Sequence, residues 1–128
     1  MMELAFLSPW ILFLFIGCLD WGFYAYSLIT LESAARTAAT WNSNHSSPND
    51  AATACTIVTT EMQSLINMNS VTTCGGSSPV SVSATQVTGP DNDNAAQVSV
   101  TYTTPAMIPI PGLLAKQFQI TRVVTMKL

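Results

Sequence analysis

The chain has 128 residues, which is enough for one small domain in addition to a strongly apolar first quarter. Charged residues make up 9% of the chain and the formal net charge is −3, so no basic stripe is available for phosphates and nucleic-acid binding is not expected. The sequence offers no nucleophile–base arrangement and no zinc-type ligand cluster, so we predict neither an enzyme nor a bound cofactor.

The first predicted element is a long apolar helix. Residues 4–31 contain no Lys or Arg, and Asp20 is the single acid among them. At about 1.5 Å per helical residue, this run is long enough to cross a hydrocarbon core of about 30 Å. A cleaved signal peptide is the alternative; it typically has a basic leading segment, a shorter apolar run and a small-residue cleavage site.

The helical pattern continues beyond the apolar run. Residues 32–41, ESAARTAATW, are good helix formers, and an apolar stripe recurs at three- and four-residue spacing. The stripe consists of Leu28, Leu31, Ala35, Ala38 and Ala39. We therefore predict one helix from about residue 3 to about residue 41, whose second half packs on the following domain.

Three residues within the apolar run have special backbone properties. Pro9 lies near the start of the helix, where we expect at most a mild kink. Gly17 and Gly22 lower helix propensity but allow a neighbouring helix to approach closely. All three are therefore candidates for a helix–helix interface.

Residues 42–47 are predicted to form a loop that leads into a second helix. Ser47 has the character of an N-cap, Pro48 of the first helical position and Asp50 of an acid in the first turn. This helix is expected to continue to about residue 68 and to be amphipathic. Its predicted buried face consists of Ala54, Ile57, Val58, Met62, Leu65 and Ile66.

Two segments that alternate apolar and polar residues follow, at residues 80–87 and 95–103. The turn-rich sequence GPDNDN between them predicts a β-hairpin. Prolines interrupt residues 105–118, which we expect to form an irregular apolar connection, and residues 118–128 are predicted to be a third strand. The apolar residues of the connection, expected to cover the core or meet a neighbour, are Met107, Ile108, Ile110, Leu113 and Leu114.

The order of these elements predicts an α+β fold. It would have a long N-terminal apolar helix, a second short helix and a three- or four-stranded antiparallel sheet. We divide the chain into residues 1–41, the long helix, and residues 42–128, a small exterior domain.

The three cysteines differ in environment. Cys18 lies in the apolar run, where we expect it to pack as a small apolar side chain. Cys55 and Cys74 lie in the polar region, and a bond between them would close a loop of about 20 residues and remove about 3 kcal/mol of unfolded-chain entropy. Because the domain is small and has the composition of an exported protein, we predict this disulfide; two free buried thiols are the alternative.

Three separated parts of the chain carry a family resemblance that spans nearly its whole length. They are the opening ELAFLSP, the helical stretch LDWGFYAYSLITLESAARTAA, and the terminal segments VSVTYTTP, IPIPGLL and ITRVVTMKL. In this order they resemble the TadE-like pilins of the tight-adherence branch of type IV pili. Two positions depart from the family pattern: the acid is Glu3 instead of the fifth residue, and Phe23 stands where many relatives carry Arg.

The resemblance implies a pilin-like fold and a structural function. It implies a precursor held by lipid in the inner membrane, whose short basic leader is removed by a prepilin peptidase. It further implies extraction by the pilus assembly machinery into an extracellular surface filament, built from copies of this chain or from other pilin subunits. The alternative function is a monomeric membrane-anchored module that binds a ligand outside the cytoplasm.

Two acids are the main candidates for the assembly interface. Glu3 is predicted to pair with the N-terminal amine of an adjacent subunit, which would set the axial register; a carboxylate that reaches the membrane surface is the alternative. Asp20 is predicted to lie in an interface, against the alternative of a simple position at the membrane boundary. Ala35 and Ala38 complete the predicted interface, because small residues permit close helix packing. These features favour assembly over a simple anchor.

Four further features receive the simpler of two interpretations. Residues 91–94, DNDN, resemble the start of a calcium loop but lack the acid at the twelfth position, so we predict a turn. His45 is expected to be a solvated loop residue. Asn44 begins a glycosylation sequon by pattern alone. The aromatic side chains of the first helix are assigned to the membrane interface and to packing, in preference to electron conduction.

Overall fold

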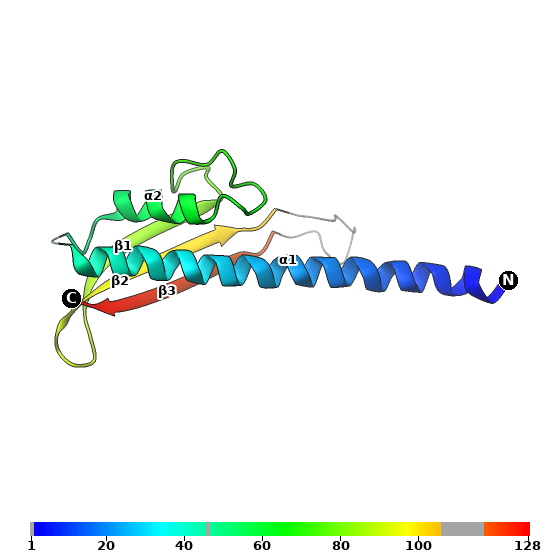
Figure 1. Cartoon of the computed structure of the whole chain (residues 1–128), viewed down its shortest axis with the longest axis horizontal. Coiled ribbons are helices and arrows are strands. Elements are labelled where there is room, and N and C mark those ends of the chain that lie inside the picture. The colour runs from blue at the N-terminus through cyan, green and yellow to red at the C-terminus, as the bar shows by residue number, and fades with distance from the viewer. Residues whose placement is uncertain (1, 46, 106–116) are drawn as a thin grey trace.

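The chain folds as two helices and one sheet, as a computed structural model shows (Figure 1). The structure describes residues 2–45, 47–105 and 117–128, with the backbone alone for residues 2–5. The helices are α1, Met2–Asn44, and α2, Ala51–Glu61; the strands are β1, Val80–Thr88, β2, Asn94–Thr103, and β3, Gln119–Lys127. The predicted α+β class, with a long apolar helix and a short second helix, is confirmed, and the sheet has three strands.

The long helix α1 has 43 residues, which corresponds to a length of about 64 Å. It continues through Pro9 without interruption. Its last turn extends three residues beyond the predicted end at Trp41. The His45 ring stacks on the Trp41 ring with centroids 4.0 Å apart, and its Nδ1 lies 2.8 Å from the Trp41 carbonyl oxygen. These two contacts hold the end of the helix, and the predicted loop is correspondingly shorter.

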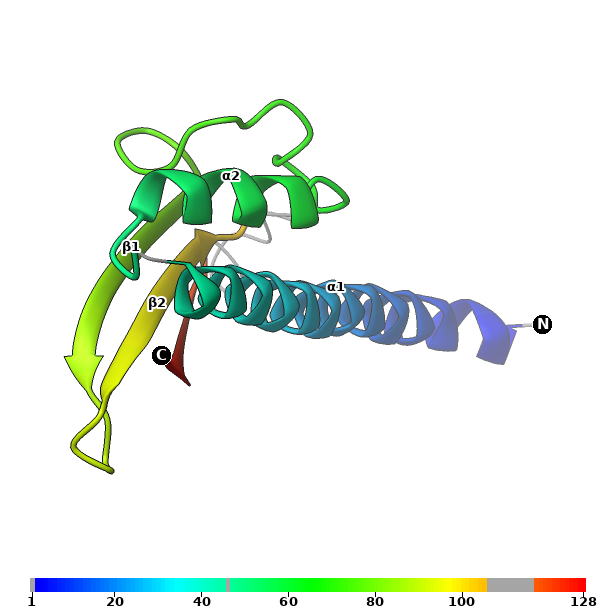
Figure 2. The ribbon, with the colours of Figure 1, turned by 60° about the vertical axis from the view of Figure 1, so that its left-hand side comes forward.

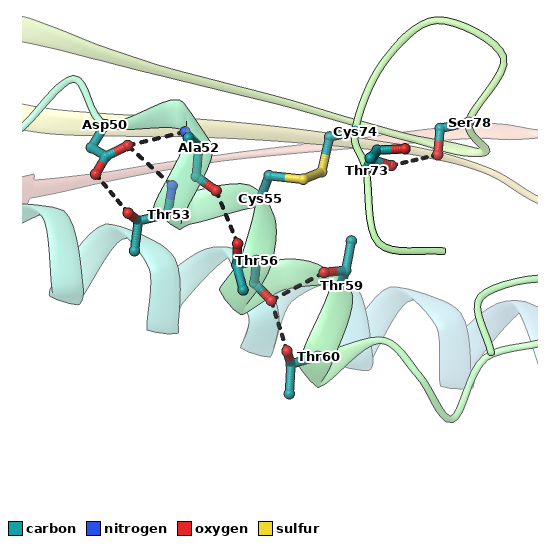
Figure 3. The surroundings of a disulfide bond; sticks show 10 residues. All are labelled: Asp50, Ala52, Thr53, Cys55, Thr56, Thr59, Thr60, Thr73, Cys74 and Ser78. Atoms are coloured by element: carbon teal, nitrogen blue, oxygen red, sulfur yellow. Dashed lines mark hydrogen bonds between the residues drawn. A yellow bond between two sulfur atoms is a disulfide. The ribbon is translucent and has the colours of Figure 1, made fainter. Parts of the chain in front are cut away.

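Helix α2 begins at a different cap from the one predicted. The N-cap is Asp50, not Ser47: its Oδ1 accepts hydrogen bonds from the backbone N–H groups of Ala52 and Thr53, at 3.1 and 3.0 Å. The Thr53 hydroxyl donates to Oδ2 at 2.6 Å (Figure 3). These bonds, with the Thr53 hydroxyl first, lower the pKa of Asp50. Ser47 instead starts a turn, since its carbonyl oxygen accepts from the Asp50 N–H.

Helix α2 also ends earlier than predicted, at Glu61, and a series of turns follows it. Asn67 lies in the left-handed region at φ 74°, a conformation that no helix interior contains. Leu65 and Met68 are nevertheless buried. Ile66, which we predicted to be buried, is exposed between them, because the turns do not maintain the helical periodicity.

The strands form a sheet in the order β1-β2-β3 with antiparallel pairing throughout. Residues 89–93 connect β1 and β2 as the predicted hairpin turn, in which the Gly89 N–H donates to the Asp93 carbonyl oxygen at 2.8 Å and Asn92 adopts φ 62°. The register places Val100 opposite Val82 on one side and opposite Arg122 on the other. The inward positions of β2 are all apolar and fully buried; they are Ala96, Val98, Val100 and Tyr102.

The core lies between the sheet and the C-terminal half of α1. Helix α1 packs against α2, β2 and β3, with Leu31 and four of its alanines buried in the core, and α2 also packs against β1. Alanine side chains let a helix approach a sheet closely, so these positions close the core without a gap. The prediction that the second half of α1 packs on the domain is confirmed, and the first half projects beyond the other elements (Figures 1 and 2).

A disulfide joins Cys55 of α2 to Cys74, which precedes β1 (Figure 3). The two Cα atoms lie 5.9 Å apart, within the range that the bond requires. Directly after Cys74, Gly75 and Gly76 have φ values of 85° and 65°, which other residues rarely adopt. The Gly75 N–H then donates to the Val80 carbonyl oxygen at 2.8 Å, so the bond ties α2 to the start of the sheet.

The predicted apolar connection between the second and third strands falls mostly on residues 106–116. Its apolar side chains, including Met107, Ile110 and Leu114, lie outside the described residues.

Candidate functional site

The N-terminal half of α1 is an exposed apolar surface. From Phe6 to Leu19 the sequence has no charged residue, and Phe6 and Trp10 expose 89% and 65% of their surface. We call residues 6–19 the apolar half of α1. Its exposed large side chains are Phe6, Leu7, Trp10, Ile11, Leu12, Phe13, Leu14, Phe15 and Leu19. A helix that is apolar on every side is stable when lipid or other apolar helices surround it.

The length and composition of α1 satisfy the requirements of a membrane span. Its apolar window reaches a mean hydropathy of 1.6, and none of that window is buried within the chain. Burial of one large apolar side chain stabilises by about 1.5–3 kcal/mol, so this surface represents a large driving force for leaving water. The predicted membrane-competent helix is therefore present, with nothing of the described chain folded over it.

The apolar half ends at Asp20, which is partly exposed. Beyond it, the Trp21 and Tyr24 rings meet edge to face with centroids 6.3 Å apart. The next charges along the helix, Glu32 and Arg36, form an ion pair one turn apart with N···O 2.6 Å. Arg36 is thus paired within its own helix.

The other interface candidates within the apolar run lie on open surface. Apart from immediate helix neighbours, no atom of the described residues lies within 4 Å of a Cβ position at Gly17 or Gly22. Pro9 lines a shallow apolar depression together with Phe6, Leu7, Trp10 and Phe13. Within the described part of the chain, nothing beyond α1 itself covers the two glycines, so a neighbouring helix can approach them.

The predicted role of Ala35 and Ala38 in the interface is corrected by their burial. Both have no exposed surface, since they belong to the chain's own core, which α1 forms with α2 and the sheet. The small-residue pattern does indicate close packing, but the partner is the rest of the same chain. Neither side chain is available to a neighbouring subunit while this domain is folded.

Glu3 lies in the first turn of α1, and its side chain is outside the described residues. Its pairing with a neighbouring amine therefore stays a prediction.

The remaining candidates occupy ordinary structural positions. Asp91 and Asp93 lie in the hairpin turn, where Lys127 pairs with both. Among the described residues, no group of three or more His, Cys, Asp or Glu side chains is placed to hold a metal ion. Asn44 is exposed at the last residue of α1, and His45, just after the helix, is exposed as predicted while its ring stacks on Trp41.

Sequence reasoning did not find the exposed side chains of Ile66 and Phe118. They lie beside α1 where its apolar half ends: Phe118 meets the Tyr24 ring with centroids 6.3 Å apart, and Ile66 lies two residues after Ser64, which accepts a hydrogen bond from Tyr26. No periodicity indicates these contacts, because the residues come from segments far apart in the chain.

The fold and this surface together define a class of protein: a small disulfide-bonded α+β domain carried by a long helix with an exposed apolar half. Residues 1–40 match the family model described as TadE-like protein, and the resemblance predicted from the sequence is confirmed over that segment. TadE-like proteins are pilus-associated and pilin-like, with an apolar N-terminal helix. Comparisons with curated proteins and with solved structures gave no match.

Proposed function

We propose that this chain is a structural subunit of a type IV pilus-like surface filament of the TadE-like kind, which polymerises through the apolar half of α1. The observation that carries the proposal is the continuous exposed apolar surface of residues 6–19, on a helix that projects beyond its own domain. Such a surface is stable in lipid and equally stable among other apolar helices. Transfer from membrane to filament therefore keeps it away from water at both stages.

The exposed glycines and Asp20 support assembly over a simple anchor. A tether needs only apolar length, whereas open surface at Gly17 and Gly22 allows the backbone of a neighbouring helix to approach. Asp20 is a partly exposed acid at the end of the apolar run, where a neighbour can supply a hydrogen-bond donor. With Ala35 and Ala38 assigned to the core, the proposed interface comprises Glu3, Pro9, Gly17, Asp20 and Gly22.

The proposed life cycle has two locations. The precursor lies in the inner membrane, where a prepilin peptidase and the assembly machinery act on it, and the finished subunit lies in an extracellular filament with its own copies or other pilin subunits. The proposed functional division assigns residues 1–41 to the assembly helix and residues 42–128 to the exterior. The core joins the two parts, because α1 from Ser27 to Asn42 contributes buried side chains to the exterior domain.

The rival function is a monomeric membrane-anchored binding module. The test compares the amount of chain in sheared surface filaments with the amount retained in membranes. Gly17→Leu and Gly22→Leu add apolar bulk where the chain itself has open space, so a tether tolerates them, whereas a filament loses close helix contact.

Ala25→Leu adds comparable bulk at another exposed position of α1 and serves as the matched control. We expect the glycine variants to reduce filament recovery with unchanged membrane levels, and the control to do so less. A chain that never enters sheared filaments would contradict the proposal and favour the anchored module.

A further inference from the structure

Aromatic and apolar side chains, exposed except for the half-buried Tyr24, gather where the exterior domain meets the apolar half of α1. They come from three parts of the chain: α1, the turns that follow α2, and the residue before β3. We call this group the collar; it consists of Trp21, Tyr24, Tyr26, Ile66 and Phe118. Trp21, Phe118 and Ile66 expose 74%, 54% and 47% of their surface.

Two sets of contacts place the collar residues at one level along α1. On one side, the Tyr24 ring packs edge to face against Trp21 and against Phe118, with centroids 6.3 Å apart in both pairs. On the other, the Tyr26 hydroxyl donates to Ser64 Oγ at 3.0 Å, two residues before Ile66 in the chain. Both outside segments thus adjoin the same stretch of α1, residues 21–26, which spans about 7–8 Å.

The exposure of Ile66 is fixed by the fold. Leu65 and Met68 on either side are buried, and the buried Tyr102 hydroxyl donates a hydrogen bond to the Ile66 carbonyl oxygen at 2.8 Å. The left-handed conformation of Asn67 then turns the chain back. The backbone at Ile66 is thus held in place while its side chain stays exposed, and with Trp21 and Phe118 it forms a group of exposed apolar side chains, which indicates a contact surface.

The level of the collar matches the edge of a membrane. Residues 2–20 of α1 have a length of about 28 Å, close to the hydrocarbon thickness of about 30 Å. The collar begins at the next residue, in the depth range where Trp and Tyr side chains are enriched at membrane interfaces. The turn segment 62–74 also carries no charged residue, so nothing in it opposes contact with lipid.

We infer that the collar seats the exterior domain on the lipid surface while α1 spans the membrane, with Ile66 and Phe118 inserted into the interfacial layer. This inference rests on the proposed membrane-held precursor. At 100° per residue, Tyr24 and Tyr26 lie on nearly opposite sides of α1, so the collar flanks the helix on two sides at one depth. A planar lipid surface covers both sides at once, whereas one neighbouring copy covers one.

The test measures the depth of environment-sensitive fluorophores on the full chain in phosphatidylcholine vesicles. In a Cys18→Ser background that retains the disulfide, a fluorophore is attached after Ile66→Cys or Phe118→Cys. Thr88→Cys is the matched reference, because it is exposed on the same domain at the hairpin end, away from the N-terminus (Figure 1). Phe13→Cys reports whether α1 itself is inserted.

We expect a nitroxide on a shallow acyl carbon to quench the probes at 66 and 118 at least about twofold more than the probe at 88. Equal quenching at 66, 118 and 88, with the probe at 13 still quenched by a deep nitroxide, overturns the inference and leaves the proposed function standing. Loss of quenching at 13 as well overturns both the inference and the proposed function. Protection of 66 and 118 from aqueous iodide without quenching from lipid assigns the collar to a second copy, which also overturns the inference.

Discussion

The two halves of α1 form one continuous helix but have opposite surroundings. Residues 6–19 present Phe, Trp, Leu and Ile side chains to the outside on every face, and residues 27–42 bury Ser, Leu, Ala and Asn side chains against the chain's own sheet and second helix. The first half is built from large apolar side chains and the second mainly from small ones. Side-chain size, more than hydrophobicity alone, distinguishes the half that packs inside the chain from the half whose side chains are exposed.

This difference has a physical basis in packing distance. Alanines allow the C-terminal half to approach the sheet, and the resulting core is complete without another chain. Large side chains on the N-terminal half would prevent such an approach but provide more apolar area for lipid or for neighbouring helices. Substitutions in the C-terminal half should therefore affect folding, and substitutions in the N-terminal half should affect insertion and assembly.

The largest expected effect is on assembly and comes from Glu3→Ala. A filament would lose the buried partner of a neighbouring amine, at a cost of about 3–5 kcal/mol per contact, whereas membrane insertion would be unchanged or improved. The measurement is recovery in sheared filaments against protein in the membrane, with Leu4→Ala as the control for lost volume. Filament yields equal to those of the parent would show that charge pairing does not set the register.

A comparably large effect on folding is expected from Leu31→Ala. Leu31 is fully buried, and truncation of a buried leucine typically destabilises by about 2–5 kcal/mol. Leu12→Ala makes the same chemical change in the exposed half and is the matched control. Denaturant unfolding of the full chain in detergent should show a lower midpoint for the Leu31 variant alone. An equal drop in the unfolding midpoint of both variants would mean that the two halves of α1 contribute equally to folding.

Removal of the disulfide should affect the exterior domain and spare the apolar half. The double variant Cys55→Ala/Cys74→Ala is expected to lose roughly 3 kcal/mol of unfolding free energy, since the bond closes a loop between residues 19 apart. Membrane retention of the variant should match that of the parent. If the variant is as stable as the parent, the disulfide does not contribute to the stability of this small domain.

The element order and the apolar half could be predicted because each depends on local composition. The hairpin followed from a turn-rich sequence between two alternating segments, and the exposed surface of residues 6–19 followed from a run without charges. The end of α2 could not be predicted in this way. Its pattern continues to about residue 68, but hydrogen bonds from Tyr26 to Ser64 and from Tyr102 to Ile66 accompany turns in place of helix.

Two pairs of residues show the same limit of prediction from sequence. Ala35 and Ala38 have the spacing and size of a helix–helix contact, and no local property of the sequence distinguishes a partner within the same chain from the helix of another chain. Ser47 and Asp50 are both good N-caps, and the hydroxyl of Thr53 supports the second of them. Sequence patterns identified surfaces that pack closely, and the tertiary fold determined their partners.

The smallest predicted effect concerns the hydrogen bond that anchors the collar. Burial raises the pKa of Tyr102 above its usual value of 10.0, because the interior disfavours the phenolate. Since the folded-state pKa is higher than the unfolded-state pKa, the resulting stability is fully present below pH 10.0 and is lost as the pH rises through the folded value. At neutral pH, Tyr102→Phe should lower the unfolding free energy by about 1 kcal/mol, because the hydrogen bond to Ile66 is lost.

The same variant should also weaken the alkaline loss of stability. The comparison is between unfolding midpoints of parent and variant at neutral pH and above pH 10.0, with Tyr26→Phe as the control, because the Tyr26 hydroxyl bonds to Ser64 on an exposed surface. If Tyr102→Phe loses stability at high pH as steeply as the parent does, the buried hydroxyl is not the group responsible. The alkaline loss of stability would then arise from another group of the chain.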